Sequence, residues 1–332
     1  MPTDSAGDAG QILDVDLLRF ERGDDAARRA VVDGVRQSLA TGFVYARHDL
    51  PDDLIDEAYG LLGAFFALDV ETKQQFVAPG SHGQTGYTGL LVETAASAVV
   101  ADWKEMLNWG PTVPAGHPLR RRSPHSYRDQ VLPESVVPGI TDVLDRFRRS
   151  ISDLQRRFLR VIAVVLGAHE TLFDDMLRDG PTLTRAIRYP AMAAAPSTEH
   201  VWAAEHGDID LITALPRATA PGLQVLTPSG WIDAVAPGDA AIINTGMMLE
   251  RLSNGVIPVG RHRVVAGGDA TVERLSVVQF CHPTPWTVLA PLAACCTEEH
   301  PQRFGAIEAG AMLEDVLWQI NLVDGDGDRA AG

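Results

Sequence analysis

The chain has 332 residues, 45% of them hydrophobic, with 28 Lys and Arg against 44 Asp and Glu and a net charge of −16. This acidic balance argues against binding to nucleic acid or to a membrane surface, because both need a positive field on the protein. Three cysteines are too few for a disulfide framework and favour a reducing, cytoplasmic compartment. No apolar run is long enough to span a bilayer.

The N-terminal part of the chain mixes two hydrophobic periods. Apolar residues recur three or four positions apart in some stretches, which predicts helices, and alternate with polar residues in others, which predicts strands. We expect residues 1–10 to be disordered, because small polar residues have little to pack against. In chain order, the predicted elements are a strand at 11–17, a helix at 24–40, a strand at 41–48, a helix at 52–66 and a helical turn at 69–76 capped by Asp69.

The middle of the chain combines a loop region with the longest predicted helix. Residues 77–135 are rich in Gly, Pro and Ser, and their basic run of Arg120, Arg121 and Arg122 favours a solvated loop over a patch that steers substrate. Residues 138–168 carry an apolar stripe at helical spacing, which is typical of a helix packed on the core.

From about residue 180 the pattern becomes β-rich. Short apolar runs separated by turn signals predict a sandwich or barrel, jelly rolls included. A closing helix is expected at 307–320 and a flexible tail at 324–332. The predicted strands lie at 183–189, 209–215, 223–227, 231–235, 240–245, 262–265 and 275–281.

The sequence His206-Gly207-Asp208 is the first candidate for chemistry. On an extended chain, side chains two residues apart point to the same side, so an imidazole and a carboxylate can reach one metal ion. His262 is the candidate for a third ligand. Two histidines and one carboxylate leave open positions on the metal, the arrangement of non-haem Fe(II) oxygenases. Taken alone, H-x-D is common by chance, and a surface loop is the other interpretation.

The sequence around this motif favours the metal site. The stretch 205–283, with HGDIDLITALP, GLQVLTPSGWIDAVAPGDAAIINTGMMLERLSNG, GRHRVV and ERLSVVQFCHP, resembles the isopenicillin N synthase-like family of Fe(II)/2-oxoglutarate dioxygenases. Weaker blocks such as GYTGLLVETA and DWKEMLNW extend the resemblance over residues 11–320. The resemblance implies that His206, Asp208 and His262 bind Fe(II).

The same resemblance implies a co-substrate site. Arg274 and Ser276 match the family's R-x-S pair, which holds the distal carboxylate of 2-oxoglutarate, and Tyr189 matches a tyrosine that contacts it. A buried guanidinium suits this task, since it is always charged and offers a fork of donors. Two positions depart from the family pattern: Ile187 replaces an Asn, and Met247 replaces an acid.

The resemblance also predicts the architecture and the reaction. The implied fold is mainly β with flanking helices, and its double-stranded β-helix (jelly-roll) core would lie at 180–290. This core would belong to a single oxygenase domain at 11–323, whose N-terminal helical and strand region covers 11–135. The implied enzyme uses Fe(II), with 2-oxoglutarate and O2 as co-substrates. It couples decarboxylation of 2-oxoglutarate to hydroxylation, desaturation or cyclisation of a small molecule.

The biological setting follows from weaker signals. Only two of the basic residues are lysines, a bias that suggests a GC-rich bacterial genome. We expect a monomer acting in natural-product biosynthesis. Two alternatives stay open: an iron oxidase of the same fold that does not use 2-oxoglutarate, and a non-catalytic binding protein.

Four further residues are candidates for contact with the substrate. Arg188 is a partner for an acidic substrate group, or else for a protein carboxylate at the rim. Asn108 and Tyr87 lie in blocks that border the active-site mouth in the family, where simple packing is the other interpretation. Phe280 is expected to line the barrel interior near the iron.

Overall fold

The computed structural model describes residues 10–81, 83–94 and 100–319. Residues 1–9 of the predicted disordered start lie outside these ranges. So do residue 320, the last residue of the predicted closing helix, and the predicted tail at 324–332. Among the described helices, none is both long and apolar enough to cross a membrane.

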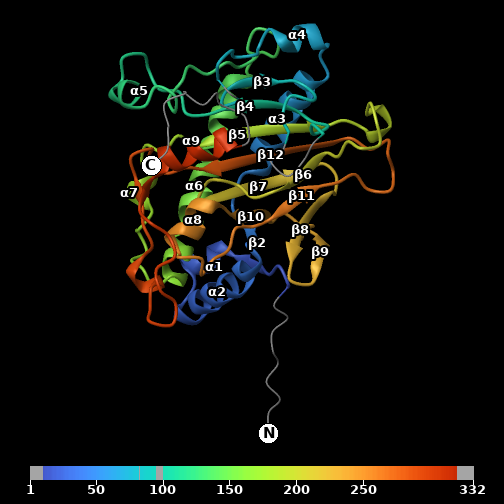
Figure 1. Ribbon diagram of the computed structural model, residues 1–332. Coiled ribbons are helices and arrows are strands. Elements are labelled where there is room, and N and C mark those ends of the chain that lie inside the picture. The colour runs from blue at the N-terminus through green and yellow to red at the C-terminus, as the bar shows by residue number, and fades with distance from the viewer. Residues whose placement is uncertain (1–9, 82, 95–99, 320–332) are drawn as a thin grey trace.

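Two β-sheets form the centre of the molecule (Figure 1). The smaller sheet consists, in spatial order, of β6 (Ala203–His206), β11 (His262–Val264), β8 (Leu223–Thr227) and β9 (Gly230–Asp233). The larger sheet consists, in spatial order, of β1 (Asp14–Asp16), β2 (Phe43–Arg47), β10 (Ala241–Thr245), β7 (Ile212–Ala218), β12 (Arg274–Cys281), β5 (Leu183–Tyr189), β4 (Glu105–Trp109) and β3 (Gly86–Thr88).

The larger sheet is antiparallel except where β1 runs parallel to β2. Together the sheets form the predicted jelly-roll core with flanking helices. Four strands of the larger sheet come from the N-terminal part of the chain, which thus extends the sheet as well as covering it. A separate short pair joins β13 (Val288–Leu289) to β14 (Ile307–Glu308).

Helices cover the outer face of the larger sheet. The longest, α6, packs against β7 and β12, and Gln155 on it donates hydrogen bonds to the backbone carbonyls of Ile212 (3.2 Å) and Gln279 (2.6 Å). In chain order the helices are α1 (Leu17–Arg22), α2 (Asp25–Ser38), α3 (Asp52–Phe66), α4 (Val70–Gln74), α5 (Pro118–Arg122), α6 (Ile140–Val165), α7 (Asp174–Leu177), α8 (Met247–Leu252) and α9 (Ala309–Gln319).

The larger sheet is buried on both faces. Ala186 and Val277 belong to the hydrophobic core beneath the helices, whereas Ile187 and Leu215 belong to a second core between the two sheets. Alternate residues of one strand therefore serve two different cores, as the two-residue period of a strand requires. Among the residues singled out by the sequence, Tyr189 belongs to this second core.

Local side-chain chemistry explains where several elements differ from their predicted bounds. The strand expected at 11–17 ends at Asp16, whose carboxylate accepts a hydrogen bond from the Leu18 amide (2.9 Å) and so caps α1. The predicted cap at Asp69 is confirmed by its bond from the Thr72 amide (2.8 Å). The basic run expected as a solvated loop instead ends α5, where Arg122 stacks 3.7 Å above the ring of Trp286.

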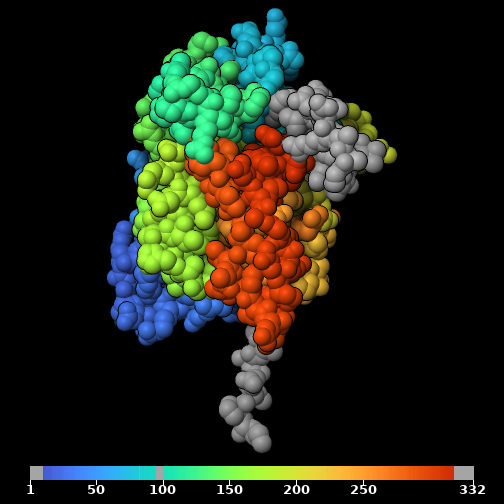
Figure 2. Space-filling model, turned by 60° about the vertical axis from the view of Figure 1, so that its left-hand side comes forward, coloured from blue at the N-terminus to red at the C-terminus, as the bar shows by residue number. Residues whose placement is uncertain are grey.

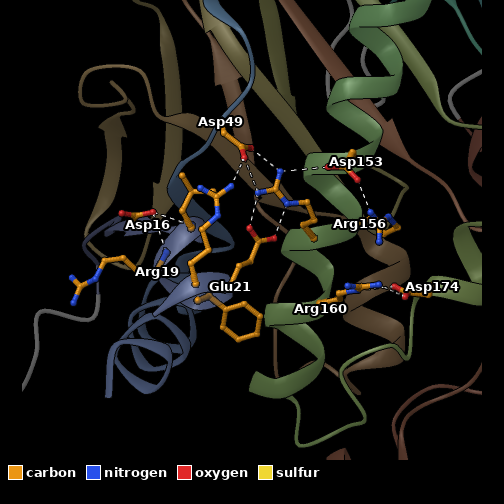
Figure 3. A network of polar contacts seen from close by, with 12 residues as sticks. Asp16, Arg19, Glu21, Asp49, Asp153, Arg156, Arg160 and Asp174 are labelled. Atoms are coloured by element: carbon orange, nitrogen blue, oxygen red, sulfur yellow. Dashed lines mark hydrogen bonds and ion pairs between the residues drawn. The ribbon is translucent and has the colours of Figure 1, made fainter. Parts of the chain in front are cut away.

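An ion-pair network joins the N-terminal elements to α6 (Figure 3). Arg157 on α6 binds both carboxylate oxygens of Glu21 on α1, at 2.6 and 2.7 Å, and one oxygen of Asp49 at 2.7 Å. Asp153 lies 3.4 Å from the same guanidinium. The network ties α1 and the segment after β2 to the helix that supports the sheet.

Helix α8 connects the C-terminal segment to the turn that carries Asp208. Figure 2 shows the described C-terminal residues (red) as a continuous band on one face. In the C-terminal part of the chain, the Leu292 amide donates to the carbonyl of Leu252 at the end of α8 (2.9 Å). At the start of α8, the Met247 amide donates to the carbonyl of Asp208 (2.8 Å). The strand predicted at 209–215 begins only at Ile212, because this turn occupies the residues before it.

Candidate metal and co-substrate site

Three candidate metal ligands meet at one end of the smaller sheet. His206 is the last residue of β6 and His262 is the first residue of β11, and the two are directly paired in the antiparallel register. Their ring centroids lie 4.3 Å apart. Asp208 follows in the turn after β6. One ligand atom from each of the three residues lies within 4.8 Å of the others.

The histidine hydrogen bonds leave one nitrogen of each ring available. Nδ1 of His206 lies 2.8 Å from the carbonyl of Ala204, and Nδ1 of His262 lies 3.0 Å from the carbonyl of Gly260. A carbonyl can only accept, so each Nδ1 carries a proton and Nε2 is the ring nitrogen left to face a metal. Histidines that bind a metal are held in this way, by a backbone carbonyl behind the ring.

Burial keeps His206 neutral. Its side chain is 38% exposed, yet the protein packed around the ring lowers its pKa to about 4, with the nearby His262 adding to the effect. At neutral pH its Nε2 is therefore an unprotonated donor, the form a metal requires.

One oxygen of Asp208 is used by the protein and the other is left for a ligand. Oδ2 accepts hydrogen bonds from Oγ1 of Thr213 (2.5 Å) and Nδ2 of Asn244 (2.7 Å). Oδ1 faces His206 instead, 4.0 Å from its Nε2. Two imidazole nitrogens and one carboxylate oxygen on a single side form the donor set of a non-haem Fe(II) site, so these residues fit that metal.

The three candidate ligands line a cavity between the two sheets. Alternate residues of two neighbouring strands, β5 and β12, form its wall, with Arg274 paired to Tyr189 and Ser276 paired to Ile187. Leu215, Leu223, Ile242, Val264 and Val278 make much of the remainder apolar. Such a cavity excludes water and strengthens the electrostatic interactions inside it.

Arg274 is a buried cation in this cavity. It is 2% exposed, and its guanidinium donates to Oγ of Ser276 (2.7 Å) and to the carbonyl of Ala220 (3.1 Å). The ring of Tyr189 lies below it, with 5.1 Å from Cζ to the ring centroid. Burial lowers the pKa of Arg274, but an arginine stays charged under ordinary conditions. A buried arginine held in place by Ser276, Ala220 and Tyr189 is suited to binding an anion.

The structure brings Phe280 to the cavity but not Arg188, Tyr87 or Asn108. Arg188 follows the strand period: Tyr189 faces the cavity, so its neighbour faces the helices. There the Arg188 guanidinium lies 2.6 Å from Glu105 and 2.7 Å from Glu273. The expected contact between Arg188 and substrate is therefore replaced by protein ion pairs.

Tyr87 and Asn108 have structural partners of their own. The Tyr87 hydroxyl donates to Glu105 at 2.5 Å, on the same outer face as Arg188. Asn108 is fully buried and accepts a hydrogen bond from Nε of Arg185 at 2.7 Å. Asn108 thus lies behind a cavity residue and does not line the cavity itself.

Sequence reasoning missed Lys104 and Arg185, which do line the cavity. A signal for Arg185 was present, because it shares the strand parity of Ile187 and Tyr189. Lys104 lies just before β4, and nothing local marks the direction of its side chain. The roles of Thr213 and Asn244 beside Asp208 depend on pairing between β7 and β10, which a single sequence does not reveal.

Comparisons with known proteins agree with this geometry. Residues 13–134 match the model for the N-terminal region of non-haem dioxygenases in morphine synthesis, and residues 182–283 match the 2OG-Fe(II) oxygenase superfamily. A 2OG-Fe(II) oxygenase family protein from Caulobacter crescentus, of known structure, is 31% identical; the match covers 94% of this chain and 99% of that one, with a TM-score of 0.82. The chain belongs to the 2OG-Fe(II) oxygenase superfamily.

Two further relatives of this oxygenase share less of its sequence. Mugineic-acid 3-dioxygenase from Hordeum vulgare is 26% identical over 93% of this chain and 86% of its own length. A Neurospora crassa protein solved in complex with alpha-KG, at 24% identity, shares the fold with a TM-score of 0.81 over 94% of this chain and 97% of that one. The predicted family is confirmed, and the oxygenase is an Fe(II)/2-oxoglutarate-dependent dioxygenase, an oxidoreductase.

Proposed function

We propose that His206, Asp208 and His262 hold the Fe(II) of this dioxygenase, and that Arg274, Ser276 and Tyr189 hold the distal carboxylate of 2-oxoglutarate. One observation carries the proposal. The three candidate ligands keep an unused donor atom each, within 4.8 Å of one another, and line the same cavity as the buried Arg274. The metal and Arg274 would then hold the two ends of one 2-oxoglutarate molecule.

The chain's own residues supply position and electrostatics. Fe(II) at this site supplies the chemistry by which 2-oxoglutarate and O2 give succinate, CO2 and an oxidised substrate. Thr213 and Asn244 hold the Asp208 carboxylate so that one oxygen stays available. Arg274, oriented by Ser276, neutralises the far carboxylate, and the apolar wall excludes water.

The substrate of the proposed reaction is a small molecule, and the outcome is hydroxylation, desaturation or cyclisation. A bacterial setting is supported by the scarcity of lysine, which suggests a GC-rich genome. A role in natural-product biosynthesis is supported by relatives named for small molecules, such as Kihadalactone A synthase LFS from Citrus sinensis. The proposal places a monomeric enzyme in the cytoplasm, where the free cysteines Cys281, Cys295 and Cys296 stay reduced.

The test is spectroscopic and then stoichiometric. Anaerobic addition of Fe(II) and 2-oxoglutarate should give the weak visible charge-transfer band of the chelate. Folded, iron-loaded protein without that band would overturn the assignment of 2-oxoglutarate. Succinate formed in proportion to oxidised substrate would exclude the same-fold iron oxidase that does not use 2-oxoglutarate.

A further inference from the structure

Two cations in the cavity are not used by the proposed iron and 2-oxoglutarate sites. Lys104 and Arg185 line the cavity together with Arg274. Among the described residues, the carboxylate of Asp208, assigned to the metal, is the cavity lining's single acidic group. Once 2-oxoglutarate is bound at Arg274, Lys104 and Arg185 are the remaining lysine and arginine side chains of this lining, next to the space left for substrate.

Both cations are held in place from behind. Nζ of Lys104 lies 2.8 Å from Oδ2 of Asp102, whose other oxygen accepts the backbone amide of Ala204 (3.1 Å). Nε of Arg185 donates to Oδ1 of Asn108 at 2.7 Å. Neither Asp102 nor Asn108 lines the cavity. Side chains fixed in this way cost less entropy when they bind a ligand, which is the usual construction of a recognition site.

A carboxylate of the protein already lies between the two cations. Oε2 of Glu93 is 3.3 Å from Nζ of Lys104 and 3.5 Å from Nη1 of Arg185. Both distances exceed the roughly 2.7–2.9 Å of a good charge-assisted hydrogen bond. Burial alone would raise the pKa of Glu93, but Arg185 and Lys104 lower it to about 2, so the group is charged.

The segment that carries Glu93 is less firmly packed than the cations. The preceding residues, Leu91 and Val92, are 39% and 62% exposed although both are apolar. The Glu93 side chain itself is 12% exposed. The contacts of Glu93 with Lys104 and Arg185 are thus longer than the bonds from these two cations to Asp102 and Asn108. Glu93 also follows exposed residues in the chain.

We propose that Lys104 and Arg185 recognise a carboxylate of the substrate, and that Glu93 occupies this position until the substrate carboxylate replaces it. The substrate class is then a small organic acid. Its uncharged part lies against Phe280, whose ring centroid is 5.5 Å from Cζ of Arg185. This inference rests on the proposed function, because it assumes that Arg274 and the metal are occupied by 2-oxoglutarate.

The test measures binding, with turnover blocked. The anaerobic complex with Fe(II) and saturating 2-oxoglutarate is titrated with hexanoate, hexanamide and hexylamine, and both calorimetry and the shift of the visible band are recorded. We expect hexanoate to bind more tightly than hexanamide, and hexylamine to bind least. Glu93→Gln removes the competing carboxylate and should strengthen hexanoate binding.

Variants of the cations locate the site. Lys104→Met and Arg185→Met should each weaken hexanoate binding about ten- to hundredfold, as expected for loss of a hydrogen bond between charged groups. Binding of 2-oxoglutarate should stay unchanged, which also shows that each variant is folded. The matched control Arg146→Met removes an exposed cation on α6 and should change neither value.

Three outcomes would overturn the inference. The first is that hexanoate binds to the Glu93→Gln protein no more tightly than hexanamide does. The second is that hexanoate binding is unchanged in both cation variants. The third is that hexylamine binds and that Glu93→Gln abolishes this binding. The acid and amide comparison needs no cation variant and remains decisive if those variants do not fold. Absence of the visible band before any hexanoate is added would instead refute the proposed function, so the two failures are distinguishable.

Discussion

Asn244 donates a hydrogen bond of 2.7 Å to Oδ2 of Asp208, the carboxylate oxygen that does not face His206. Thr213 donates to the same oxygen, so two neutral donors from two strands of the larger sheet fix a residue at the edge of the smaller one. Because all three of these side chains are buried, the carboxylate has one free oxygen and one orientation.

Removal of the hydrogen bond from Asn244 should weaken metal binding. Asn244→Ala leaves Oδ2 of Asp208 with one donor, and we expect the Kd for Fe(II) to rise about ten- to hundredfold, as for other groups that orient a metal ligand. Anaerobic titration with Fe(II) or Co(II) measures this directly. Gln224→Ala, in the smaller sheet on β8, is the control. Equal metal affinity in both proteins would show that Asp208 does not bind the metal in the orientation described here.

Arg274 should control the affinity for 2-oxoglutarate without changing that for iron. Arg274→Ala removes a buried donor to a charged ligand, so the Kd for 2-oxoglutarate should rise about ten- to hundredfold or more. Arg274→Lys should recover part of the affinity, since it keeps the charge and loses the fork. Ser276→Ala should have a smaller effect. The visible band, titrated with 2-oxoglutarate, reports all three, and an unchanged affinity in Arg274→Ala would contradict the assignment.

Glu105 should be a stability residue. Its side chain is 1% exposed and accepts from Lys73 (2.7 Å), Tyr87 (2.5 Å) and Arg188 (2.6 Å). Glu105→Gln leaves the buried Lys73 without its counter-charge, which typically costs about 3–5 kcal/mol of unfolding free energy. Urea unfolding measures it, with Glu273→Gln as an exposed control.

Arg188→Met tests the same cluster from the other side. Because Arg188 pairs with Glu105 and Glu273 outside the cavity, its removal should lower the free energy of unfolding and leave the Kd for 2-oxoglutarate unchanged. Once the substrate is known, KM should also be unchanged. A large rise in KM at full stability would restore Arg188 as a substrate contact.

The ion-pair network on α6 should add stability that depends on pH. The hydrogen bond from Arg157 lowers the pKa of Asp49 below its ordinary value. A lowered folded pKa means that the stabilisation is complete above the unfolded pKa of about 3.9 and is lost as the pH falls through the folded value. The difference in stability between wild type and Arg157→Met should therefore shrink from pH 7 to pH 3. A difference that stays constant over this range would contradict the role of Asp49.

Much of the fold could be predicted from the sequence, because the hydrophobic period of a helix or strand is a local pattern. The helix expected at 138–168 spans Ile140–Val165, and the strands β5 and β8 have the predicted bounds. Strands β3, β4 and β6 were not predicted as strands. Each has at most five residues, and at that length the alternation of apolar and polar positions is hard to separate from a loop.

The candidate site was predictable where one short motif carried it and unpredictable where separate strands meet. H-x-D and R-x-S place Asp208 and Arg274 from sequence, and both line the cavity. The partners of Arg188 lie on other segments, so a single sequence shows its charge but not its direction. Strand parity with Tyr189 would have corrected this prediction and would have indicated Arg185 instead.

The alternation of β5 also limits how this enzyme can change its substrate. Arg185, Ile187 and Tyr189 face the cavity, whereas Thr184, Ala186 and Arg188 hold the strand to the outer layer. A deletion or insertion of one residue would exchange the two rows and place the core residues in the cavity. New specificities are therefore open to point substitution at Arg185 and Ile187, with Tyr189 kept for 2-oxoglutarate, and closed to changes in strand length, which gives directed evolution a small and well-defined library.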